Sequence, residues 1–263
     1  MPVTIHDLRA FKERGERFPM LTAYDSATAE ILDEAGIPVL LVGDSLAQVV
    51  LGYESTIPVE IDEMLHHTRA VARGARNALV VGDMPFGTYG ASVEDGVRNA
   101  VRFMKEGRAH AVKFEGPQFD LAERLSSIGV PVMAHLGLTP QSVHLFGGYK
   151  VQGRSDEQAS NILRWAKELE EAGAFAVVLE CVPTELAARI TRTLSIPTIG
   201  IGAGPHCDGQ VLVVNDMAGL TNGKAPKFVK RYADLRGQLS AAARAYADEV
   251  SRGEYPGPEH SYS

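Results

Sequence analysis

Five carboxylates in this sequence stand at or just beyond the end of a short apolar run, a placement typical of groups that bind metals or move protons. They are Asp25, Asp44, Asp83, Glu115 and Glu180. If the runs are parallel strands closed into a barrel, their carboxyl ends meet on one face and the five side chains share a pocket. Crowded carboxylates repel one another unless a cation neutralises them, and hard oxygen ligands favour Mg²⁺ over zinc. The pattern therefore predicts a divalent metal site.

A simpler interpretation applies to each aspartate taken alone, because Asp after a strand is also a common helix N-cap. Asp44 and Asp83 differ from an isolated Asp, since each completes a Val-Gly-Asp turn, at 42–44 and at 81–83. The repeated turn favours metal binding for these two residues.

The run Val-Lys-Phe-Glu at 112–115 alternates apolar and charged residues, so Lys113 and Glu115 are predicted to point into the same interior. A buried lysine needs an anionic partner, which the carboxylate or enolate oxygen of a substrate would supply. The alternative is an internal ion pair between Lys113 and Glu115.

The histidines and cysteines carry weaker signals. His135 ends a candidate strand, where a neutral imidazole would hydrogen-bond a substrate or a base; a core histidine is the alternative. His66 and His67 are adjacent and cannot form the i,i+4 pair of zinc enzymes, so both are expected to be structural. Cys181 follows Glu180 at a likely strand end, but no base signature accompanies it and a reduced, non-nucleophilic thiol is expected.

The glycine-rich run 200–204 invites a dinucleotide-binding interpretation. Pro205 stands where the third glycine of the G-x-G-x-x-G fingerprint belongs, and no helical pattern follows. We therefore expect a tight barrel turn beside the substrate.

Short β-branched runs alternate with longer segments of helical periodicity, which is the pattern of a parallel α/β sheet. Eight strands are predicted, and this number favours a single-domain (β/α)₈ TIM barrel over 1–263: 20–24, 39–42, 78–81, 111–114, 130–134, 174–179, 197–201 and 210–214. Crossover helices are predicted between them at 26–35, 93–106, 119–128, 156–172 and 184–194.

The remaining segments are predicted to surround the barrel. A helix at 4–14 closes its bottom, and a long Ala-rich helix at 227–252 packs outside it or on another subunit. Residues 139–154 interrupt the rhythm and form either a lid or a structured surface connection. Residues 253–263 form a poorly tethered tail.

Composition narrows the function classes. The 263 residues carry a net charge of -7, which argues against a broad nucleic-acid surface. The start of the chain lacks a secretory signal, and the apolar runs are too short to cross a bilayer. A cytoplasmic protein that binds neither nucleic acid nor membrane is expected.

Seven segments, in their order and spacing, resemble the ketopantoate hydroxymethyltransferase family: 21–25, 42–45, 82–86, 112–116, 134–141, 179–183 and 200–204. The resemblance runs from about residue 4 to residue 228. It implies a barrel of the phosphoenolpyruvate/pyruvate-binding superfamily, assembled as a homodecamer.

The resemblance also implies an activity: transfer of a hydroxymethyl group from 5,10-methylenetetrahydrofolate to 3-methyl-2-oxobutanoate, with one Mg²⁺ per subunit. By matching motif, Asp44 and Asp83 bind the metal and the substrate, with Glu115 as a further metal ligand. Ser45 and Lys113 contact the keto acid, and Glu180 is the catalytic base. His135, at the end of its strand, is added to the substrate contacts.

Two alternatives remain open from the residues. A metal-dependent lyase of the same superfamily would release a keto acid without folate, although no lyase loop signature is present. A barrel that only binds a ligand would show no metal-dependent proton exchange, and its buried charges would be costly without a function.

Overall fold

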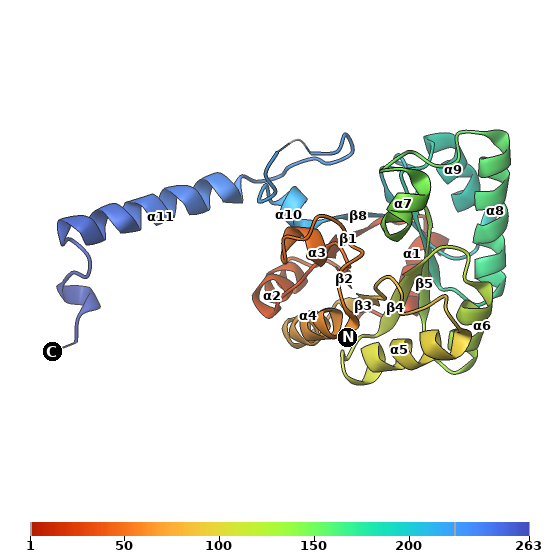
Figure 1. Ribbon diagram of the computed structural model, residues 1–263, viewed down its shortest axis with the longest axis horizontal. Helices are drawn as coiled ribbons and strands as arrows, with labels where there is room; N and C mark the ends of the chain where they lie inside the picture. The colour runs from red at the N-terminus through yellow and green to blue at the C-terminus, as the bar shows by residue number, and fades with distance from the viewer. Residues whose placement is uncertain (1, 224, 263) are drawn as a thin grey trace. The chain divides into compact units, whose positions relative to one another are not determined.

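A closed barrel of eight parallel strands forms the first of two compact units, Met1–Val213 and Val214–Ser263 (Figure 1). The computed structural model describes residues 2–223 and 225–262. Each strand pairs with the next along the chain, and β8 pairs with β1. The strands are β1 Phe18–Thr22, β2 Val39–Val42, β3 Leu79–Asp83, β4 Ala111–Glu115, β5 Val132–Gly137, β6 Ala176–Glu180, β7 Thr198–Ile201 and β8 Gly209–Leu212. The predicted (β/α)₈ barrel is therefore confirmed.

Helices follow the strands and cover the outside of the sheet (Figure 1). Ser92 and Ser155 begin α5 and α8 by accepting a hydrogen bond from the backbone N–H three residues on, which satisfies a donor that the first turn leaves free. The helices of this unit are α1 Ile5–Glu13, α2 Ser26–Glu34, α3 Leu46–Val49, α4 Ile61–Gly74, α5 Val93–Lys105, α6 Phe119–Ser127, η1 Pro140–Ser142, α7 Val143–Phe146, α8 Asp156–Glu171 and α9 Thr184–Thr193.

Helix α1 packs against the amino-terminal end of the barrel, as predicted. Leu8 is fully buried in a cluster with the first residues of four strands, Phe18, Val39, Leu79 and Ala111. Because apolar side chains fill this end of the barrel, solvent cannot reach the polar groups at the carboxyl end from the amino-terminal side.

The predicted first strand differs from the observed one by two residues. Strand β1 begins at Phe18 rather than residue 20, because Phe18 already pairs with Gly209 of β8. That pairing depends on a residue far along the chain, so local periodicity does not reveal it.

The second unit contains α10 Val214–Met217, α11 Leu235–Arg252 and η2 Pro258–His260. The helix expected from residue 227 begins only at Leu235, because the Asp234 side chain accepts from Gly237 N and caps it there. Within the expected tail Tyr255 packs against Tyr246 and His260, whereas Ser263 lies outside the described residues. The expectation of one domain over 1–263 stays a prediction.

Among the described residues, no helix combines the length and the apolar character that crossing a membrane requires.

Candidate active site

The carboxyl ends of adjacent strands carry the polar side chains predicted for the site. Asp83, Glu115 and Glu180 are the last residues of β3, β4 and β6. The register places Asp83 beside Lys113 and Glu115 beside His135. These residues, far apart in sequence, therefore lie at one level of the barrel, on the face where barrel enzymes hold their substrates.

The carboxylate of Asp83 accepts hydrogen bonds from both Lys113 and Asp44. Lys113 Nζ donates to both of its carboxylate oxygens, at 2.7 and 2.8 Å, and Asp44 N donates to its Oδ2 at 3.2 Å. Lys113 and Glu115 do both point inward, as predicted, but the ion pair of Lys113 is with Asp83, not Glu115. The register explains the difference, because Asp83 is directly opposite Lys113 on the neighbouring strand.

Burial sets the electrostatics of this group. It raises the pKa of Asp44 well above its usual value, with the neighbouring Asp83 and Glu115 adding to the effect. For Lys113 burial lowers the pKa, but the surrounding carboxylates outweigh it and the pKa is raised overall. Lys113 is therefore an ammonium group at neutral pH, whereas the ionised form of Asp44 is disfavoured and a cation beside it would stabilise that form.

His135 lies between two carboxylates. Its Nε2 is 3.3 Å from Glu180 Oε2 and its Nδ1 is 3.5 Å from Glu115 Oε1. Burial and Lys113 oppose a charge on His135, but the two carboxylates outweigh them and raise its pKa to about 9. We expected a neutral imidazole, and the structure instead favours an imidazolium because two acids contact the ring.

Ser45 follows Asp44 in the turn, and its Oγ lies 2.9 Å from the hydroxyl of Tyr24. Asp25, which we grouped with the site carboxylates, is not part of this group. It is exposed and caps α2, accepting from Thr28 N at 2.8 Å. Its N-cap interpretation is the correct one, because α2 begins at the very next residue.

The other chemical candidates have structural surroundings. His67 Nδ1 contacts the Tyr24 carbonyl at 2.6 Å, on the barrel side of α4. Burial and Glu180 raise the pKa of Cys181 to about 11, so its thiol stays protonated and a nucleophilic role is not favoured. After the run 200–204 the chain enters β8 at Gly209 without a helix, as expected for a turn rather than a dinucleotide fingerprint.

Two residues of the site were not singled out from the sequence. Gln141 is buried and contacts both Asp44 and Glu115, and Tyr89 donates its hydroxyl proton to Gln141. Gln141 stands in the segment 134–141 that carried the resemblance, which was its only signal. Tyr89 lies in the loop after β3 and had none.

The segment 139–154 contains η1 and α7 and then passes through Gly147 and Gly148. Both glycines have positive φ, a conformation that costs glycine little. Leu145 is 85% exposed, whereas Gln152 N donates to the Cys181 carbonyl and ties the end of the segment to β6. Its function as a lid stays a prediction.

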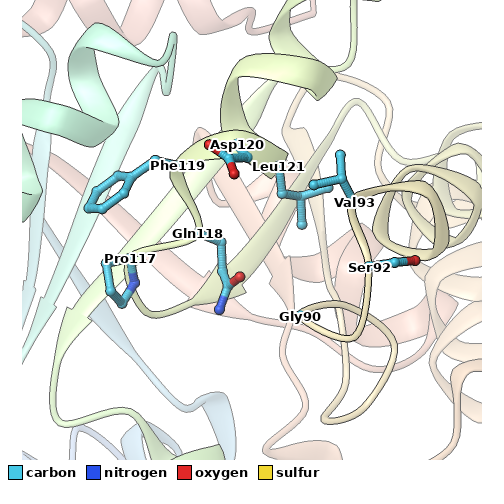
Figure 2. A pocket seen from close by; sticks show the side chains of 8 residues that line it. All are labelled: Gly90, Ser92, Val93, Pro117, Gln118, Phe119, Asp120 and Leu121. Atoms are coloured by element: carbon cyan, nitrogen blue, oxygen red, sulfur yellow. The ribbon is translucent and has the colours of Figure 1, made fainter.

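A separate pocket of about 270 Å³ lies between the loops that lead into α5 and α6 (Figure 2). In Figure 2 the side chain of Gln118 extends toward Gly90 across it. None of the predicted site residues lines this pocket; its lining is Gly90, Ser92, Val93, Pro117, Gln118, Phe119, Asp120 and Leu121.

The oxygen donors of the site suit a hard divalent cation. Asp44, Asp83 and Glu115 are all buried, and Glu115 Oε1 has no hydrogen-bond partner. Among the described residues, no group of three or more His, Cys, Asp or Glu side chains is arranged to hold a metal ion by itself. Mg²⁺ is usually held by one or two carboxylates together with water and substrate, so Asp44 and Asp83 are the residues that could hold it here.

The fold and the polar strand ends define a class: (β/α)₈ barrels with a polar site at the carboxyl ends of the strands. Solved structures share this fold, among them a member of the PEP mutase/isocitrate lyase superfamily. A phosphonopyruvate hydrolase solved with oxalate and Mg²⁺ matches with a TM-score of 0.62 and 13% identity, over 98% of this chain and 93% of that one. A 2,3-dimethylmalate lyase titled as a member of that superfamily matches with a TM-score of 0.61 and 15% identity, over 100% and 89%. At these identities the likeness shows the fold.

The particular family follows from the sequence comparisons. The model of the ketopantoate hydroxymethyltransferase family matches residues 2–258. The 3-methyl-2-oxobutanoate hydroxymethyltransferases of Thermobifida fusca and Syntrophus aciditrophicus are 60% and 58% identical, each over 99% of this chain and over 94% and 96% of their own. The chain belongs to the ketopantoate hydroxymethyltransferase family, and the resemblance found in its motifs is confirmed.

Proposed function

We propose that this protein transfers a hydroxymethyl group from 5,10-methylenetetrahydrofolate to 3-methyl-2-oxobutanoate, with one water consumed, to form 2-dehydropantoate and tetrahydrofolate. The observation that carries the proposal is the arrangement at the strand ends. A partly exposed glutamate, Glu180, stands beside a buried group of carboxylates and Lys113, in a chain of this family.

Asp44 and Asp83 would hold a Mg²⁺ ion, with Glu115 as a further ligand, directly or through water. When bound, the cation supplies Lewis-acid stabilisation of negative charge on the keto oxygen of the substrate. Asp44 follows β2 and Asp83 ends the neighbouring β3, and Asp44 N donates a hydrogen bond to Asp83 Oδ2, so the two residues lie side by side.

Lys113 also stabilises negative charge on the keto oxygen of the substrate. Its ammonium group is held against Asp83 by two hydrogen bonds and keeps its charge, so it attracts an anionic keto acid. Ser45 donates to or accepts from the same substrate through its hydroxyl. These contacts orient the acid so that its C3 faces Glu180.

Glu180 acts as the base that removes the C3 proton, since its carboxylate is the one of the group that remains partly open. The side chain of Glu180 is 16% exposed, compared with 3% for Glu115 and 2% for Asp83. His135 contacts Oε2 of Glu180, which leaves Oε1 to reach the substrate. The substrate carbon then attacks the one-carbon unit of the folate.

We further propose that the enzyme is cytoplasmic, a location that suits a reaction between two small soluble metabolites. We also propose that it assembles as a homodecamer, as the family resemblance implies.

Exchange of the C3 proton of 3-methyl-2-oxobutanoate, followed by NMR in D₂O, tests the proposed function. We expect exchange that requires Mg²⁺ but not folate, because proton removal precedes carbon transfer. Exchange at the same rate without metal would overturn the role of the metal, and exchange only with folate would overturn the order of steps. Cleavage of a 2-oxo or dicarboxylic acid without folate would favour the lyase alternative.

A further inference from the structure

Gln141, in the loop after β5, has a buried side-chain amide whose hydrogen-bonding groups are all engaged. Its Nε2 donates to Asp44 Oδ2 at 2.9 Å and to the Met84 carbonyl at 3.0 Å. Its Oε1 accepts from the hydroxyl of Tyr89 at 2.6 Å. Both N–H groups and the carbonyl oxygen of the amide therefore have partners.

Tyr89 determines which way this amide faces. The hydroxyl of Tyr89 accepts a hydrogen bond from Glu115 N at 2.9 Å, so its own proton points toward Gln141 Oε1. A flipped amide would place Oε1 against Asp44 and the Met84 carbonyl, which are both acceptors. Since both unfavourable contacts would be buried, the observed orientation is strongly preferred.

The backbone of Gln141 engages a second carboxylate. Its N–H donates to Glu115 Oε2 at 3.0 Å. One residue of the β5 loop thus contacts Asp44, which follows β2, and Glu115, which ends β4. Of the three proposed metal ligands, Asp83 accepts hydrogen bonds from Lys113, and Asp44 and Glu115 do not.

In each of these carboxylates the other oxygen accepts no hydrogen bond from the described residues, although the ring of His135 lies 3.5 Å from Glu115 Oε1. Within the described part of the chain, Gln141 engages Oδ2 of Asp44 and no hydrogen bond reaches Oδ1. Glu115 Oε1 likewise has no hydrogen-bond partner. The terminal torsion of a carboxylate is soft, so a fixed contact on one oxygen sets the direction of the other.

We propose that Gln141 is a positioning residue that holds Asp44 and Glu115 in the orientation needed to bind a divalent cation, with Tyr89 fixing its amide. The inference rests on the proposed function in one respect, that Asp44 and Glu115 are metal ligands. Partners that orient metal ligands typically change metal affinity 10- to 100-fold when removed. The β5 loop would then contribute to metal binding without touching the ion.

The direct test is Gln141→Met, which keeps the length of the side chain, removes its hydrogen bonds to Asp44, Met84 and Tyr89, and leaves the backbone N–H bond to Glu115 in place. Calorimetric titration of the folded protein with Mg²⁺ alone should show affinity weakened about 10- to 100-fold. At saturating Mg²⁺ the rate of C3 exchange should largely recover, so that the metal concentration for half-maximal exchange changes far more than the maximal rate. A variant that loses only thermal stability and binds Mg²⁺ like the wild type would overturn the inference.

Tyr89→Phe removes one oxygen and provides a second test that does not alter Gln141. We expect weaker Mg²⁺ binding in the same direction and by a smaller factor. Tyr53→Phe is the matched control, because Tyr53 also donates to an acceptor, Glu63, but on the surface. It should bind Mg²⁺ like the wild type. If Gln141→Met does not fold, Tyr89→Phe decides the question.

Two further variants distinguish a failure of the positioning inference from a failure of the proposed function. The double variant Gln141→Met, Tyr89→Phe should bind Mg²⁺ no more weakly than Gln141→Met alone, because the hydroxyl acts through the amide; additive effects would contradict the chain from Tyr89 to Asp44. Asp44→Ala with wild-type Mg²⁺ affinity would remove the metal site and with it the proposed function. If Asp44→Ala loses the metal while both Gln141→Met and Tyr89→Phe retain it, only the positioning inference fails.

Discussion

The site carboxylates have different environments at the scale of single residues, and these differences suggest different functions. Asp83 is held by the ammonium of Lys113, Asp44 by the amide of Gln141, and Glu180 by the ring of His135. The first two are buried, whereas Glu180 retains some exposure. A ligand needs a fixed direction and a base needs access to the substrate, so these contacts support the proposal that Glu180 is the base and the aspartates are the metal ligands.

Glu180→Gln should separate binding from chemistry. The change keeps the shape of the side chain and removes its ability to accept a proton. We expect wild-type affinity for Mg²⁺ and for the keto acid, with loss of both C3 exchange and hydroxymethyl transfer, because both depend on the same proton removal. NMR exchange in D₂O and calorimetry measure the two properties. A folded variant that exchanges the C3 proton at the wild-type rate would exclude Glu180 as the base.

His135 should make the stability of the protein depend on pH in alkaline solution. Its pKa is raised to about 9 in the folded chain, compared with about 6.5 when unfolded, so its stabilising effect is complete below pH 6.5 and disappears as the pH rises toward 9. His135→Asn lacks this titration.

The measurement for His135 is the unfolding free energy of wild type and His135→Asn in urea, without Mg²⁺, from pH 6 to pH 10. We expect the wild type to lose about 2 to 3 kcal/mol relative to the variant across this window. A difference that stays constant with pH would show that His135 does not gain its proton from these contacts.

At the scale of elements, helix capping determines which strand-end aspartate enters the site. Asp25 and Asp44 both follow a strand, yet Asp25 directly precedes α2 and accepts from its first turn. The short α3 begins at Leu46, and its N-cap residue Ser45 makes no side-chain capping hydrogen bond. Asp44 instead donates its backbone N–H to Asp83 on the neighbouring strand. The same residue type thus caps a helix in one βα unit and enters the site in the next.

Asp25→Ala should reduce stability by about 1 kcal/mol, the usual cost of losing an N-cap. Asp25→Asn should retain most of the cap, because its amide oxygen still accepts from Thr28 N. Neither change should alter Mg²⁺ affinity, in contrast to Asp44→Ala. Urea denaturation and calorimetry give the two readouts, and weaker Mg²⁺ binding by Asp25→Ala would return this residue to the metal site.

Closure of the barrel is what assembles the site at the scale of the whole molecule. Asp44, Asp83, Glu115 and Glu180 come from four different strands or the turns after them, and α1 seals the opposite end with Leu8. Because the carboxylates meet only in the folded barrel, the metal binding that we propose would be coupled to folding.

Mg²⁺ should therefore stabilise the whole protein. A ligand that binds only the folded state at a concentration of 100 Kd adds about 2.7 kcal/mol to the unfolding free energy. We expect the melting temperature of the wild type to rise with Mg²⁺ concentration and that of Asp44→Ala to stay constant. A similar rise in both would place the stabilising ion elsewhere on the protein.

The sequence alone determined the alternation of strands and helices, because periodicity and capping act over a few residues. It also identified Asp44, Asp83, Glu115 and Glu180 as strand-end carboxylates, since each adjoins its own apolar run. Only the tertiary structure separated Asp25 from them and paired Lys113 with Asp83. It alone brought Gln141 against Asp44, 97 residues away in the chain. Such pairings depend on the register between strands and on loops folding back over the barrel, which are set by contacts distant in sequence rather than by any local pattern.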